Sequence, residues 1–113
     1  MGGQATALGA QTWDSLGLTH HHLGQHRQAA ECYRHALDLY RELAERGLGD
    51  RYNEAATLVR LGDTRLAAGD PAAARAAWER GLAVLDAIRH LEAADVRTKL
   101  ARLVTPSGAR SGP

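Results

Sequence analysis

Apolar residues along the chain recur every three or four positions, which is the spacing of an α-helix with one buried face. The pattern is clearest between about Gln25 and Arg46, where the charged side chains point away from one apolar face. The residues on that face are Ala29, Tyr33, Ala36, Leu37, Tyr40, Leu43 and Ala44. We therefore predict an amphipathic helix over this segment.

Glycines mark the turns between this helix and its neighbours. Gly24 follows a stripe formed by Trp13, Leu16, Gly17 and His20. Gly69-Asp70-Pro71 is the stronger turn signal, because Gly can close one helix, Asp can cap the next and Pro suits its first position. The helix predicted after this turn runs to about Arg89. Its apolar positions are Ala74, Ala77, Trp78, Gly81, Leu82, Leu85 and Ile88.

The chain contains an internal repeat with a period of 45 residues, since Leu16-Gly17 reappears as Leu61-Gly62. The other matched pairs keep their size class and their order: Gly24 with Gly69, Ala29 with Ala74, Tyr33 with Trp78, Leu37 with Leu82, and Tyr40 with Leu85. Such self-similarity predicts two copies of one helical hairpin.

The predicted organisation is one domain over residues 1–104, followed by a disordered tail over 105–113. The domain consists of a hairpin at about 6–46, a second hairpin at about 51–89 and a capping helix at about 92–104, in which Val96, Leu100 and Leu103 share a face. The tail is predicted because its sequence is polar and rich in Gly and Pro.

The repeat resembles the tetratricopeptide repeat, whose signature is Trp-x2-Leu-Gly-x2-Tyr, a turn Gly, Ala-x3-Phe and a further Ala. The first copy has Trp13-x2-Leu16-Gly17-x2-His20, Gly24, Ala29-x3-Tyr33 and Ala36. The second copy has Leu58-x2-Leu61-Gly62-x2-Arg65, Gly69, Ala74-x3-Trp78 and Gly81. The resemblance covers roughly residues 10 to 90, and it departs from the family where His20 and Arg65 replace the signature Tyr.

The resemblance implies an all-α fold, a tetratricopeptide-like α-solenoid of two antiparallel hairpins plus a C-terminal capping helix. The period exceeds the family's usual length of about 34 residues by about three helical turns, so longer hairpins can keep the same face toward the core. Long hairpins of this kind resemble those of kinesin light chains and the C-terminal arrays of bacterial signal-transduction ATPases and transcriptional regulators. The implied function is to bind a peptide or protein segment on the concave face, as a regulatory fragment of such a bacterial protein.

In this family the first helix of each hairpin lines the concave face. The expected partner-binding residues are Gln11, Asp14, Leu18, His21, His22, Val59, Arg60, Asp63 and Leu66. Leu18, Val59 and Leu66 are apolar where solvent is otherwise expected, which is typical of an interaction groove. The alternative is that these residues pack against the terminal helix.

Composition excludes several other function classes. The formal net charge is only +1 and the charged residues are interspersed, so neither a nucleic-acid footprint nor direct nucleic-acid binding is expected. No apolar run approaches the roughly 20 residues that span a bilayer, so no membrane association is expected. Cys32 is the single cysteine, which favours a reducing, cytoplasmic location.

Two hairpins are fewer than the three or so repeats that usually bury a repeat core. This suggests either a fragment of a longer array or self-association. The expected partner is a protein or peptide, which includes another domain of the same parent chain, and a homodimer formed by a self-associating domain is the alternative.

A metal site is a further alternative, because His20, His21, His22 and His26 lie close together in the sequence. Adjacent helical residues point about 100° apart and Gly24 interrupts the helix, so no metal ligands are expected. The sequence also lacks nucleotide-binding and nucleophile motifs, and its carboxylates are expected to be solvated. We expect no catalytic residues and no cofactor.

Overall fold

The computed structural model describes the backbone of residues 5–111 and the side chains as far as Leu103. In this part of the chain there are five helices and no strand, which confirms the all-α prediction. The helices are α1 (Ala7–His22), α2 (His26–Glu45), α3 (Arg51–Ala67), α4 (Pro71–Ala87) and α5 (Ala93–Ser111).

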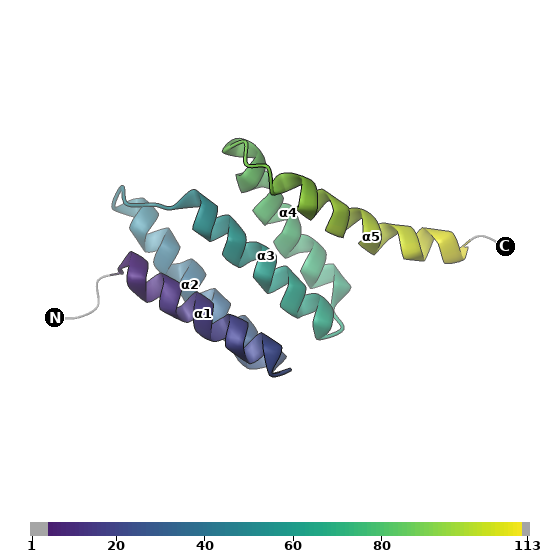
Figure 1. The fold of residues 1–113 in the computed structure, drawn as a ribbon, viewed down its shortest axis with the longest axis horizontal. Coiled ribbons are helices and arrows are strands. Elements are labelled where there is room, and N and C mark those ends of the chain that lie inside the picture. The colour runs from purple at the N-terminus through teal and green to yellow at the C-terminus, as the bar shows by residue number, and fades with distance from the viewer. Residues whose placement is uncertain (1–4, 112–113) are drawn as a thin grey trace.

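The helices form two antiparallel hairpins and a final helix that packs on the second hairpin. α1 packs against α2, α3 against α4, and α2 against α3, while α5 contacts α4. In the view of Figure 1, α1 and α3 lie in front of α2 and α4, and α1 and α5 occupy opposite ends of the array. The result is an elongated stack of 62 × 32 × 17 Å, not a closed bundle.

The turns within the hairpins have the chemistry expected from the sequence. Gly24 and Gly69 have φ angles of 77° and 88°, in the left-handed region that favours glycine. The Asp70 carboxylate accepts a hydrogen bond from the backbone N–H of Ala73, at 3.1 Å, and Pro71 occupies the start of α4. The predicted turn at Gly69-Asp70-Pro71 is thus confirmed.

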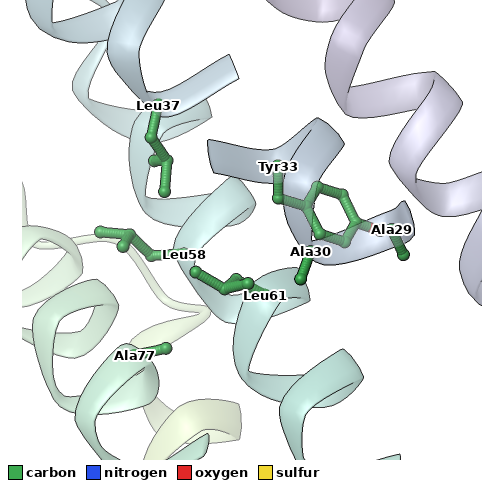
Figure 2. Close-up of a cluster of buried hydrophobic side chains, with 7 residues drawn as sticks. All are labelled: Ala29, Ala30, Tyr33, Leu37, Leu58, Leu61 and Ala77. Carbon is green, nitrogen blue, oxygen red and sulfur yellow. The ribbon is translucent and has the colours of Figure 1, made fainter. Parts of the chain in front are cut away.

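The two hairpins meet through a cluster of buried side chains from α2, α3 and α4. Figure 2 shows its members, which are Ala29, Ala30, Tyr33, Leu37, Leu58, Leu61 and Ala77. The alanines leave room for the helices to approach, and the leucines and tyrosine supply most of the buried apolar surface.

Each hairpin also places one aromatic ring directly over one glycine. A Cβ atom at Gly17 would lie 2.6 Å from Cε1 of Tyr33, and one at Gly62 would lie 2.3 Å from Cδ1 of Trp78. Both distances are shorter than a normal contact, so only glycine fits at these positions. The matched size classes of the repeat therefore reflect matched contacts between the helices of each hairpin.

Leu16 departs from the predicted core stripe. Its side chain is 43% exposed, whereas Leu61, the equivalent residue of the second repeat, is only 7% exposed. Leu61 is covered because α3 packs on the preceding helix α2. Among the described residues no helix precedes α1, so nothing covers Leu16 in the same way.

The end of α5 also differs from the prediction. The sequence predicts a helix to about residue 104 and a disordered tail over 105–113, but the helix continues through Pro106 to Ser111. Ala93 and Val96 are buried and anchor its first turns. Once a helix is nucleated, each further residue except proline adds a backbone hydrogen bond, so elongation can continue beyond the packed turns although Pro106 itself donates none. The predicted helix end is corrected to Ser111, and residues 112–113 of the predicted tail lie outside the described residues.

Candidate functional site

A cleft of about 680 Å³ lies between α3 and α5 and reaches the end of α1. Its walls are formed by His21, Asp63, Leu66, Ala67, Trp78, Lys99, Arg102 and Leu103. A smaller hollow of about 140 Å³ shares His21 and Asp63 with this cleft. The two hollows thus adjoin along the surface formed by α1, α3 and α5.

Six of the nine residues expected at the partner-binding surface line these hollows. Leu66 lines the cleft, His21 and Asp63 line both spaces, and Leu18, His22 and Arg60 line the smaller hollow. Gln11 is exposed on α1 and lines neither space. The structure therefore brings together most of the expected residues, together with side chains of α5, the terminal helix that the alternative interpretation placed against them.

Val59 lines neither hollow, and its side chain is partly buried against α4. Its Cγ2 atom lies 3.0 Å from the position that a Cβ atom would take at Gly81 of α4, and its side chain packs with the cluster around Trp78. Because Gly81 has no side chain, α3 and α4 approach closely and Val59 fills the space between them. Helical spacing alone did not reveal this close approach.

Asp14 is partly buried and held by two groups of α3. It forms an ion pair with Arg60, and the Thr57 hydroxyl donates a hydrogen bond to its Oδ1 atom at 3.0 Å. Burial raises the pKa of Asp14 above its ordinary value of 3.8, and this effect exceeds the opposing effects of Arg60 and Thr57. The expectation that the carboxylates are solvated is therefore wrong for Asp14.

The raised pKa has a defined consequence for stability. Asp14 holds its proton more tightly in the folded chain than in the unfolded chain, so its contribution favours folding most below pH 3.8 and decreases as the carboxyl group ionises at higher pH. Asp14 thus joins α1 to α3 through its contacts with Arg60 and Thr57.

Two further polar contacts hold the walls of the cleft together. The ring atom Nδ1 of His21 lies 2.9 Å from the hydroxyl oxygen of Thr64, which joins α1 to α3. Lys99 Nζ donates a hydrogen bond to Asp63 Oδ1 at 3.0 Å, and the same ammonium group lies 5.6 Å from the ring centroid of Trp78. The contacts of Lys99 join α5 to α3 and α4, so the lining of the cleft comes from four helices, α1, α3, α4 and α5.

From the sequence, contact with the terminal helix was only an alternative, and Lys99 and Arg102 were not identified as residues of the cleft. Lys99 and Arg102 line its rim and Leu103 its apolar wall, although the sequence placed only Leu103 on a buried face. The available signal was the helical spacing of Leu103 after Leu100, which predicts a shared face but not the surface that α5 covers. The position of Lys99 and Arg102 became clear only from the packing of α5.

Chemically, the cleft combines apolar walls with a few charged groups. Leu66 and Leu103 can contact an apolar side chain, with the buried ring of Trp78 behind them, while Lys99, Arg102 and Asp63 can contact polar groups beside it. In the described part of the chain, no three His, Cys, Asp or Glu side chains are arranged to hold a metal ion. Within the same residues, none of the helices combines the length and apolar character needed to cross a membrane.

Comparison with known protein families gives a match over most of the two hairpins. The family model for the tetratricopeptide repeat matches residues 10–87. The chain belongs to the tetratricopeptide repeat family. Tetratricopeptide repeats mediate protein–protein interactions and are not enzymes. The match ends with α4, so α5 and its cleft residues lie outside it. No curated protein and no solved structure matches the chain.

Proposed function

We propose that this tetratricopeptide repeat domain binds a segment of a partner protein on its concave face, in the cleft between α3 and α5. The observation that carries this proposal is Leu66, which is 43% exposed on the wall of a cleft that also contains Trp78 and Leu103. An apolar side chain of the partner fills this space, and Lys99, Arg102 and Asp63 contact the polar groups beside it.

The wider setting of the domain is part of the same proposal. Long hairpins resemble the repeat arrays of bacterial signalling proteins and transcriptional regulators, so the partner segment belongs to such a protein or to another domain of the parent chain. The free, buried thiol of Cys32 fits a reducing cytoplasm. These features support the proposal of a regulatory interaction domain.

Leu66→Glu is expected to weaken binding of the partner segment by at least about tenfold, because the new carboxylate must be desolvated when an apolar side chain enters the cleft. Peptides are first selected from a random library on the wild-type domain. Fluorescence anisotropy then measures their affinity for wild type and variant, and circular dichroism measures helicity.

Leu91→Glu is the matched control, since Leu91 is 84% exposed between α4 and α5 and lines neither hollow. It is expected to bind the selected peptides as wild type does. If Leu66→Glu unfolds the domain, Leu66 belongs to the core. If every selected peptide binds both proteins equally, the cleft is not the binding site.

Self-association through the outer face of α1 is a second candidate function, and the exposure of Leu16 favours it. In the second repeat the equivalent Leu61 is buried against α2, so a helix from another copy can cover Leu16 in the same manner. Burial of an apolar face at the open end of a helical stack stabilises a dimer.

Leu16→Glu is expected to convert a dimer to a monomer in multi-angle light scattering, because a buried charge opposes apolar packing. Leu23→Glu serves as a control at another exposed leucine near the end of α1. A wild-type domain that stays monomeric at all accessible concentrations would exclude this candidate.

A further inference from the structure

The other side of α3 carries a second recess, formed with α2 and α4 and unrelated to the cleft. It consists of two adjoining hollows of about 440 and 360 Å³ that share Arg34 and Arg65. Arg41 and Arg80 line the first hollow, and Arg27 lines the second. We name this recess the arginine groove, after Arg27, Arg34, Arg41, Arg65 and Arg80.

The arginine groove concentrates positive charge in a chain that is nearly neutral. Five arginines and only two carboxylates, those of Glu31 and Asp38, line it, although the whole chain has a formal net charge of +1. Asp38 lies 3.9 Å from Arg41. Within the described residues, the guanidinium groups of Arg34, Arg65 and Arg80 have no carboxylate partner. The groove therefore has unpaired guanidinium groups available to an anionic partner.

The spacing of these arginines suits a peptide in an extended conformation. Arg27, Arg34 and Arg41 recur every seven residues on α2, so a rise of 1.5 Å per residue places them about 10 Å apart along the helix axis. A peptide in the extended polyproline II conformation has three residues per turn and advances about 3.1 Å per residue, so acidic residues three positions apart lie on one side of it, about 9 Å apart, close to that interval.

The floor of the groove distinguishes a peptide from a nucleic acid. Ala73 and Ala76 of α4 keep apolar surface exposed there, above the buried Leu37, Leu61 and Ala77, and can contact aliphatic side chains. Neither hollow is lined by Trp, Tyr or Phe, whereas single-stranded nucleic acids are usually bound by stacking their bases on such rings. The planar, forked guanidinium group pairs well with a carboxylate.

From this combination of unpaired arginines and an apolar floor, we propose that the arginine groove binds an acidic peptide segment. The segment lies extended along α2, its Asp or Glu carboxylates pair with the arginines, and its intervening apolar side chains contact Ala73 and Ala76. This surface is separate from the cleft of the proposed function, so the domain can hold two segments at once.

The test uses a fluorescein-labelled peptide with glutamates three positions apart and alanine and leucine between them, and a matched peptide with glutamine in place of each glutamate. Anisotropy titrations of the whole chain at low salt are expected to show binding of the glutamate peptide only, and added salt is expected to weaken it. Arg34→Gln/Arg65→Gln is expected to weaken binding about tenfold, since two partly exposed ion pairs are lost.

Arg51→Gln/Arg75→Gln is the matched control, because it removes the same charge from exposed positions of α3 and α4 that do not line the groove. This control variant is expected to bind the glutamate peptide with the same affinity as wild type. Leu66→Glu is also expected to bind the glutamate peptide normally, which separates this proposal from the proposed function. If the Arg34→Gln/Arg65→Gln protein loses helicity, the Arg41→Gln/Arg80→Gln protein is used in the same titration in its place.

Three results would overturn the proposal. The first is that the wild-type chain does not bind the glutamate peptide. The second is that the control and groove variants weaken binding equally, which indicates nonspecific attraction. The third is that a uridine oligonucleotide binds more tightly than the peptide and depends on the same arginines, which assigns the groove to nucleic acid.

Discussion

Trp78→Ala is expected to lower the free energy of unfolding by about 3 to 5 kcal/mol, the usual cost of removing a large buried aromatic side chain. Trp78 is only 2% exposed, and its ring lies over Gly62 between α3 and α4. Its Nε1 atom also donates a hydrogen bond to the carbonyl oxygen of Val59, at 3.1 Å. The substitution removes these contacts and leaves a cavity between the two helices.

Urea denaturation followed by circular dichroism measures this effect. Leu91→Ala is the control, because Leu91 is exposed and its truncation is expected to change stability little. A Trp78→Ala protein as stable as wild type would mean that the buried face of α4 has been misassigned. The same substitution is expected to impair peptide binding, since Trp78 lines the cleft and Lys99 lies over its ring.

Gly62→Ala is expected to lower the free energy of unfolding by about 2 kcal/mol, although alanine is the better helix former by about 1 kcal/mol. The added methyl group would lie 2.3 Å from both Cδ1 and Nε1 of Trp78, so the ring must move. Overpacking a core typically costs about 1 to 3 kcal/mol, and displacing the ring also weakens its hydrogen bond to Val59 by about 1 kcal/mol. The steric cost therefore exceeds the gain in helix propensity.

A double-mutant cycle checks the physical reason for this loss. In a Trp78→Ala background the ring is absent, so Gly62→Ala is expected to be neutral or stabilising there. Equal destabilisation in both backgrounds would show that the ring is not the cause. Gly17→Ala is expected to be destabilising in the same way, because its Cβ atom would meet Tyr33 in the first repeat.

The internal repeat predicted much of the fold correctly. Tyr33 and Trp78 lie at matched positions and cover matched glycines, and Gly24 and Gly69 end the first helix of each hairpin. The site was predictable only in part. Leu18, His21 and Leu66 line the hollows, as expected for one face of α1 and α3, whereas Val59 packs against Gly81 and Asp14 is engaged with Arg60.

The sequence by itself determined the helices, their turns and the pairing within each hairpin, because these depend on helical periodicity, glycine conformation and contacts repeated at a fixed interval. Only the tertiary structure decided which helical faces are covered. Leu61 and Leu16 are equivalent in the repeat, yet Leu61 is buried and Leu16 is exposed. The reason is that α2 covers the face of α3 that carries Leu61, whereas no described helix precedes α1 to cover Leu16 in the same way. Likewise, packing of α5 forms the cleft and packing of α2, α3 and α4 forms the arginine groove. Periodicity predicts which residues share a face, but the burial and charge of that face depend on segments distant in the sequence.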